Sequence, residues 1–162
     1  MYQVGHYGAA LLTYAPLGTA VALTGNETTA LVGALVCVAL STLPDCDHQL
    51  PFLEHRGPTH SFVFALLVGG GLAAVTAVFV DATSPLLGVG VVAFAFVVGT
   101  LSIVSHILAD ALTPMGVRPF WPLSSRHYTL EVTTAANPLA NYALFGIGTA
   151  ATIAGLSVVV LA

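Results

Sequence analysis

The chain has 162 residues, of which 57% are hydrophobic and only 6% are charged. Soluble globular proteins carry about 25% charged residues, so this composition excludes an ordinary water-soluble enzyme, and it also excludes a disordered chain. The sequence has three arginines and no lysine, which excludes nucleic-acid binding through a basic surface. The mean hydropathy of +0.95 instead predicts a polytopic membrane protein, and the length predicts a single domain, residues 1–162.

Long stretches without charge predict five membrane-spanning helices, because about 20 apolar residues are needed to cross a bilayer. In chain order, we expect these helices at Tyr7–Leu23, Thr28–Leu43, Thr59–Val80, Leu86–Leu112 and Pro138–Leu161. The local signals that agree with these limits are the turn pairs Gly25–Asn26 and Ser84–Pro85, the helix-stopping Pro44 and the N-cap pair Asn137–Pro138. The predicted fold class is therefore all-α.

Three further patterns lie within the apolar runs. The small residues at 20–22 resemble a signal-peptide cleavage site, but no Lys or Arg precedes the apolar run. Residues 88–93 match the glycine pattern of dinucleotide-binding proteins, but no strand is predicted before them and no acidic residue follows at the required distance. We therefore expect neither cleavage nor dinucleotide binding. The glycines and alanines at 69–74 predict a close approach between helices.

Alternate passage of the five helices through the membrane makes the two faces very different. All six histidines fall on one face, and every charged residue except Glu27 and Asp81 falls there as well. Because the three arginines are on this polar face, the positive-inside rule predicts that it is cytoplasmic. We therefore expect a multi-pass protein of the cell membrane with its polar chemistry on the cytoplasmic side.

His106 and Asp110 are the most informative pair on this face. They are four residues apart on a predicted helix, so both side chains project from one side at neighbouring turns. Ionisable groups within membrane helices are costly and are functional candidates by default. The pair can bind one cation, which would offset that cost; the alternative is a buried hydrogen-bonded pair that joins helices.

Other candidate ligands on the same face extend this pair into a predicted metal site. Imidazole and carboxylate together suit zinc, manganese, iron or nickel better than calcium or magnesium, and zinc is our first choice, with manganese as an alternative. The donors exceed the need of one tetrahedral ion, so one or two ions fit, with Asp47 as the bridging candidate. The predicted metal ligands are His6, Asp47, His48, His60, His106 and Asp110.

Structural alternatives remain open for several of these residues. His6 could be an interfacial histidine, and His60 could face head groups at a helix start. His48 could orient a ligand without binding metal, and Asp45 could cap the second helix.

The predicted catalytic residues are Asp45, His55 and Arg56. Arg56 precedes a rigid Gly-Pro turn and is interpreted as an anion clamp, because a guanidinium group matches phosphate with paired donors. Asp45 is the candidate general base, and His55 adjoins Arg56. The connection at residues 113–137 is interpreted as a lid over the site, since loops of this length are usually functional or mobile.

Four ordered blocks carry a resemblance to a known family: Gly5-His6-Tyr7-Gly8-Ala9, Leu43-Pro44-Asp45-Cys46-Asp47-His48, His55-Arg56-Gly57-Pro58-Thr59-His60-Ser61, and the run from Ser105 to Val117. They resemble the YdjM-like family of membrane-bound metal-dependent hydrolases, of the LexA-regulated inner-membrane type. The resemblance implies metal-binding positions at His6, Asp47, His60, His106 and Asp110. A weaker similarity links the chain to the zinc-dependent phospholipase C and P1 nuclease group, although the N-terminal tryptophan ligand of that group is absent.

These expectations combine into a membrane hydrolase. One or two zinc-like ions would lower the pKa of a water to about 7 and direct it at a phosphoester of a lipid or lipid-linked substrate. A metal or proton transporter is the alternative, although the fourth helix is apolar beyond Ser102. A structural metal-binding membrane protein is a further alternative.

Overall fold

The computed structural model of the protein describes residues 1–49, 56–80 and 85–162. It contains the α-helices α1 (Gln3–Ala22), α2 (Glu27–Leu40), α3 (Phe62–Phe79), α4 (Pro85–Ala111) and α5 (Pro138–Leu161), and the short 3₁₀ helices η1 (Leu43–Gln49) and η2 (Pro58–His60). Over these described ranges, an isolated antiparallel bridge between Val117 and Tyr128 is the one β-type pairing. The all-α prediction is confirmed.

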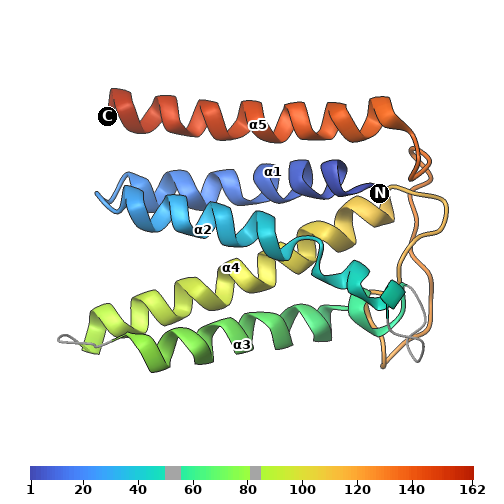
Figure 1. Ribbon diagram of the computed structural model, residues 1–162, viewed down its shortest axis with the longest axis horizontal. Coiled ribbons are helices and arrows are strands. Elements are labelled where there is room, and N and C mark those ends of the chain that lie inside the picture. The colour runs from blue at the N-terminus through green and yellow to red at the C-terminus, as the bar shows by residue number, and fades with distance from the viewer. Residues whose placement is uncertain (50–55, 81–84) are drawn as a thin grey trace.

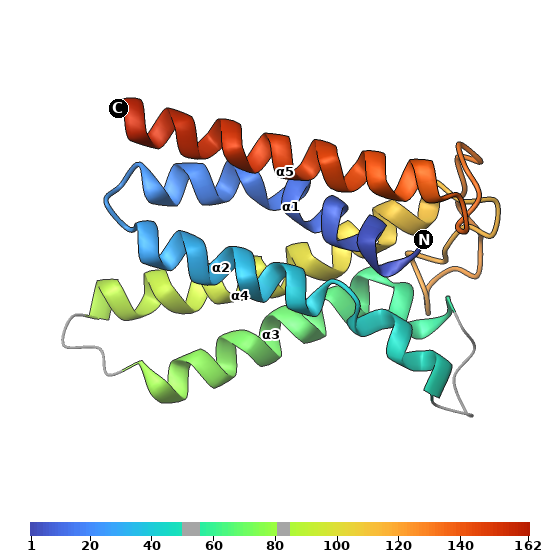
Figure 2. The ribbon, with the colours of Figure 1, turned by 45° about the horizontal axis from the view of Figure 1, so that its top comes forward.

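The helices lie side by side, and successive helices run in opposite directions (Figure 1). Helices α1 and α4 are central, because α1 packs against α2, α4 and α5, and α4 packs against α1, α2 and α3. The N-terminus, η1, η2 and the connection after α4 gather at one end of the bundle, and the α1–α2 turn and the C-terminus lie at the opposite end (Figures 1 and 2). This is the alternation that the charge pattern predicted.

Within the described residues, four helical segments are long and apolar enough to cross a bilayer, namely Glu27–His48, Phe62–Phe79, Gly88–Ala111 and Pro138–Leu161. They support a multi-pass membrane protein. Helix α1 is not among them, although it was predicted as the first span. Helix α1 contains polar residues such as Gln3, His6 and Thr13 among many alanines and glycines, and this composition lowers its hydropathy.

Helix α1 begins at Gln3, earlier than the predicted Tyr7, and α2 differs from its predicted limits at its end. Helix α2 ends at Leu40, earlier than the predicted Leu43, and the chain continues as the 3₁₀ helix η1. Pro44 explains this, because proline disfavours the α conformation of the residue before it and lacks an N–H for the helical ladder. Helix α5 has the predicted limits, and the side chain of its N-cap residue Asn137 accepts a hydrogen bond from the backbone N–H of Ala140 at 3.2 Å.

Glycines allow the closest helix contacts. A methyl group on Gly148 of α5 would overlap the carbonyl oxygen of Gly8 in α1, and one on Gly99 of α4 would lie 2.9 Å from the Cα atom of Gly69 in α3. The prediction of close approach at 69–74 is therefore confirmed at Gly69. It is wrong at Gly70 and Gly71, because a methyl group there would meet nothing within 4 Å.

We predict that Gly148→Ala destabilises the bundle whereas Gly146→Ala does not. Both changes raise helix propensity equally, but only Gly148 faces α1, and a methyl group on Gly146 meets nothing within 4 Å. Overpacking of this kind costs about 1–3 kcal/mol. Thermal unfolding of the two variants in detergent, followed by circular dichroism, measures the difference. Equal midpoints in the two variants would contradict the close α1–α5 contact.

Candidate metal centre

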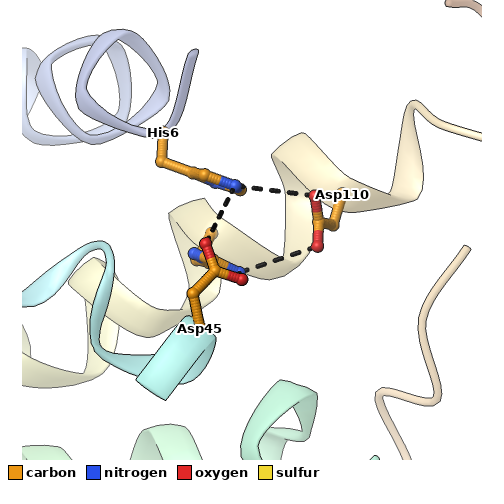
Figure 3. Close-up of side chains that lie close together, drawn as sticks. His6, Asp45 and Asp110 are labelled. Atoms are coloured by element: carbon orange, nitrogen blue, oxygen red, sulfur yellow. Dashed lines mark ion pairs between the residues drawn. The ribbon is translucent and has the colours of Figure 1, made fainter. Parts of the chain in front are cut away.

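Four elements bring ionisable side chains together at one end of the bundle. His6 comes from the start of α1, Asp45 from η1, His60 from the end of η2, and His106 and Asp110 from the last turns of α4. The side chains of His6, Asp45 and Asp110 point toward one another (Figure 3). We call these five residues the His–Asp cluster.

The cluster is almost completely buried. The three imidazoles are fully buried and Asp110 is 1% exposed, whereas the side chain of Asp45 is 28% exposed. Burial of this degree is rare for carboxylates without partners, because a charge loses its hydration when it leaves water. Asp45 is therefore the member of the cluster that faces outward.

Both carboxylates lie close to histidine nitrogens. His60 Nε2 is 3.7 Å from Asp45 Oδ1 and 3.5 Å from Asp110 Oδ2, and His106 Nε2 is 3.6 Å from each of the same oxygens. The two Nε2 atoms are 3.0 Å apart. A tetrahedral ion with bonds of about 2.0–2.2 Å places its donors about 3.3–3.6 Å apart, so the four nitrogen–oxygen distances suit one ion, whereas the two nitrogens would have to move apart to bind it.

His6 completes the cluster on the other side of the carboxylates. Its Nε2 is 3.8 Å from Asp45 Oδ2 and 3.6 Å from Asp110 Oδ1, and one ligand atom from each of His6, Asp45, His106 and Asp110 lies within 4.8 Å of all the others. The rings of His6 and His106 stack, with centroids 3.7 Å apart and planes 5° from parallel. The cluster can therefore hold a metal ion.

Unpartnered polar atoms concentrate in and beside this cluster. In the part of the chain that the structure describes, Asp110 Oδ2, His6 Nδ1 and Arg56 Nε are buried and have no hydrogen-bond partner. Native proteins rarely leave buried polar atoms unpaired, and a bound ion or water commonly satisfies those that lack a protein partner. Asp110 Oδ2 is also one of the four oxygen and nitrogen atoms described above as possible metal ligands. The same oxygen therefore lacks a hydrogen-bond partner and lies where it could bind an ion.

Neighbouring groups orient two of the imidazoles. His106 Nδ1 lies 2.6 Å from the carbonyl oxygen of Ser41, which can only accept, so Nδ1 carries the proton and Nε2 keeps its lone pair. His60 Nδ1 is 3.0 Å from Thr59 Oγ1 and 3.5 Å from Asp47 Oδ2. Metal-binding histidines typically use their second nitrogen in this way.

The electrostatics of the cluster favour positive charge near His60. Burial lowers the pKa of His60, but the carboxylates of Asp110, Asp45 and Asp47 raise it more, and its net pKa shift is upward. The carboxylates thus draw a cation, either a proton or a metal ion, to this side of the cluster.

Arg56 borders the cluster and is 7% exposed. Its Nη2 is 3.2 Å from Asp110 Oδ1, and its Nη1 donates to Thr113 Oγ1 at 2.8 Å and to the carbonyl oxygen of Gly116 at 3.2 Å. Arg56 has a φ of 61°, which is costly for a non-glycine residue and persists only where the surroundings hold it. Both Nη nitrogens are therefore engaged, whereas Nε has no hydrogen-bond partner among the described residues.

Asp47 and His48 lie outside the His–Asp cluster. Asp47 accepts hydrogen bonds from the hydroxyl of Thr59 at 2.8 Å and from the backbone N–H of Arg56 at 3.2 Å, so it lies behind His60. His48 is exposed. His55 lies outside the described residues. Asp45, the predicted general base, lies close to His6, His60 and His106, whereas the ligand roles of Asp47 and His48 stay predictions.

Two supporting residues were not singled out from the sequence. Thr59 links Asp47 to His60, and its place directly before a candidate ligand was the available signal. Asn141 accepts a hydrogen bond from the backbone N–H of Tyr2 at 3.0 Å, and so fixes the start of α1 that carries His6. A buried amide near the start of an otherwise apolar helix could have indicated it.

The connection at residues 113–137 packs against the site end of the bundle. Besides the contacts of Thr113 and Gly116 with Arg56, the backbone N–H of Leu130 donates to the carbonyl oxygen of Ala111 at 2.8 Å, and the N–H of Phe62 donates to that of Pro119 at 2.8 Å. Leu123 is 91% exposed. These contacts place the connection beside the cluster; its role as a lid stays a prediction.

The fold and the cluster define an all-helical, multi-pass membrane protein with buried histidine and aspartate side chains that can hold a metal ion. Residues 1–162 match the family described as YdjM inner membrane protein, and the chain belongs to this family. Neither a curated protein nor a solved structure matches the chain. The family description names a membrane location and no enzymatic activity, and nothing in these comparisons supports the similarity to the phospholipase C and P1 nuclease group.

We predict that Asp47→Asn lowers metal affinity about 10–100-fold, the effect typical of groups that orient a ligand. The number of ions bound at saturating metal should stay the same, because Asp47 contacts the far side of the His60 ring. Equilibrium titration with zinc against a chelator measures both quantities, with Glu27→Gln at the opposite end as the matched control. Loss of a whole ion at saturation would instead make Asp47 a direct ligand.

Proposed function

We propose that the protein is a membrane-embedded, metal-dependent hydrolase that cleaves a phosphoester of a lipid or lipid-linked substrate. The observation that carries this proposal is a buried His–Asp donor set with an unpartnered carboxylate oxygen, placed beside a buried guanidinium group at one end of an apolar bundle. Metal-dependent hydrolases need these same parts, which are a metal site and a positive group for the developing charge.

The donor chemistry supports zinc, and manganese also fits, because imidazole and carboxylate ligands suit both ions. When bound, such an ion supplies a water whose pKa falls to about 7. If the site holds a single ion, His60, His106 and Asp110 would bind it. Asp45, the partly exposed member of the cluster, reaches the outer side, and in that single-ion site its carboxylate can accept a proton as a general base.

Arg56 supports a phosphoester over other esters. Its guanidinium group is buried beside the cluster and its Nε has no partner among the described residues, so one donor is free for a phosphoryl oxygen. A buried donor of this kind binds an anion strongly, because the charge is poorly screened and the hydrogen bond is charge-assisted. His55 is retained as a candidate on sequence grounds, next to Arg56.

The membrane setting supports a lipid substrate. We propose that α1 is the fifth span, because its 20 residues are about 30 Å long, and because it connects the two ends of the bundle (Figure 1). The cluster would then lie near one membrane surface, within reach of head groups. The three arginines are all on the chain segments of that end, which supports a cytoplasmic orientation.

A transport function has less support. Transit across the membrane needs polar groups that continue beyond the metal site, whereas residues 88–99 of α4 are all glycine, alanine, valine or phenylalanine. A purely structural role for the metal predicts that removal of the ion unfolds the protein and that no substrate turns over.

We predict that His106→Ala and Asp110→Ala each abolish metal binding and hydrolysis together. Both residues contribute donors that are buried in the cluster. Metal content is measured by mass spectrometry. On the same detergent-purified samples, hydrolysis is measured as phosphate released from phosphatidic acid vesicles and as phosphomonoester and alcohol products formed from vesicles of a phosphodiester lipid. His127→Ala, an exposed histidine outside the cluster, is the control and should retain both properties.

The four proteins are first compared by circular dichroism and size exclusion, so that unfolded variants are recognised. Metal bound by the wild type without turnover of any lipid phosphoester would contradict the hydrolase. Absence of bound metal in the wild type would contradict the site itself.

We predict that Cys46 reacts with a membrane-impermeant maleimide in inside-out vesicles and not in intact cells. Cys46 is exposed on η1 at the cluster end of the bundle, whereas Cys37 is buried in the core. Labelling is measured by the mass of the purified protein, with Cys46→Ser as the control and detergent-solubilised protein as the full-reaction reference. Labelling in intact cells would place the cluster on the outer face.

A further inference from the structure

We infer that the cluster has two neighbouring cation positions, bridged by the carboxylates of Asp45 and Asp110, and that the two positions differ in how completely the protein encloses them. This inference rests on the metal site of the proposed function and adds the number of ions and the part that each histidine plays.

The first position is the one defined by His60 and His106. Its donors are the two Nε2 atoms, Asp45 Oδ1 and Asp110 Oδ2, separated by 3.0–3.7 Å in the pairs that involve a histidine. Four protein donors fill a tetrahedral ion completely, as in metal sites whose role is structural. An ion there would anchor the end of α4 to η1 and η2.

The second position is on the His6 side. Each carboxylate directs its other oxygen there, with Asp45 Oδ2 at 3.8 Å and Asp110 Oδ1 at 3.6 Å from His6 Nε2. The division of oxygens between the two sides is the arrangement by which carboxylates bridge paired ions, which lie about 3.5–4 Å apart. The described residues supply three donors here, so this position keeps room for a water and a substrate oxygen, as catalytic sites do.

Positive charge already gathers at the second position. Asp110 Oδ1 is contacted by the α-amino group of Met1 and lies 3.2 Å from Arg56 Nη2. A metal ion would take the place of the amino group, while Arg56 would stay beside it to meet an anionic substrate.

The imidazole of His6 can bind an ion if its proton moves from Nε2 to Nδ1. Its Nε2 is 3.0 Å from the carbonyl oxygen of Met1, and its Nδ1 is buried without a partner among the described residues. The carbonyl oxygen can only accept, so Nε2 carries the proton in this structure; binding of an ion at Nε2 requires the imidazole proton to reside on Nδ1 instead. The stacked ring of His106 keeps the plane of His6 fixed during this exchange.

The test counts ions and detects their coupling without relying on activity. Purified protein is loaded with Mn²⁺, the bound metal is quantified by mass spectrometry, and the electron paramagnetic resonance spectrum is recorded. We expect two ions per chain and the multiline spectrum of an exchange-coupled pair. His6→Gln should retain one ion and give the spectrum of an isolated Mn²⁺, whereas the control His127→Gln should match the wild type.

A second variant tests the first position. His60→Gln should lower the affinity for both ions, because the bridging carboxylates lose the ion that holds them, and circular dichroism checks that each variant is folded. One ion in the wild type, unchanged in His6→Gln, would overturn the paired site while leaving a mononuclear hydrolase intact. Two ions in both the wild type and His6→Gln would overturn the part given to His6. Two coupled ions with no turnover of lipid phosphoesters would support the paired site and contradict the proposed function.

Discussion

The carboxylate of Asp110 is buried at the end of an apolar helix bundle, and the surrounding chain is arranged around its charge. An unpaired charge in such a place costs several kcal/mol, so positive or proton-donating groups must reach it from elsewhere in the sequence. His6 arrives from α1, His60 from η2 and Arg56 from the segment before η2. The positive φ angle of Arg56 is consistent with this need for positive charge, because its guanidinium group contacts Asp110 while its backbone N–H donates to Asp47.

Two polar side chains of α4, Ser102 and His106, contact the end of α2. The last carbonyl groups of a helix have no partner inside the helix. Here the hydroxyl of Ser102 donates to the carbonyl oxygen of Cys37 at 2.6 Å, and His106 Nδ1 donates to that of Ser41 at 2.6 Å. Side chains of α4 therefore satisfy the end of α2, and in return Ser41 fixes the tautomer of His106. The hydrogen bond between His106 and Ser41 thus joins α4 to the end of α2 and also orients His106 as a metal ligand.

The sequence predicted the helices well because the membrane imposes long uncharged runs, and the alternation of those runs already placed the histidines at one end. It could not choose between Asp45 and Asp47. In a 3₁₀ helix with three residues per turn, positions two apart point in different directions, and the direction of each depends on how η1 meets α4. Asp45 consequently faces His60 and His106, whereas Asp47 faces Thr59 and the backbone of Arg56. The sequence also could not predict that α1 lies between other helices, because its position depends on packing against three of them.

The burial of its residues shows on which side the cluster is open. The imidazoles and Asp110 are enclosed, whereas Asp45 is partly exposed on η1, so the cluster opens where η1 lies and is closed toward the apolar interior. Helices α3 and α5 present large exposed apolar side chains along their length, such as Leu67 and Leu156, as expected for surfaces in contact with lipid tails. For the lipid substrate that we propose, this arrangement lets the head group reach the cluster from the end of the bundle while the acyl chains stay beside those helices. The same geometry keeps bulk water away from Asp110 and Arg56, which strengthens every electrostatic contact that a bound anion would make there.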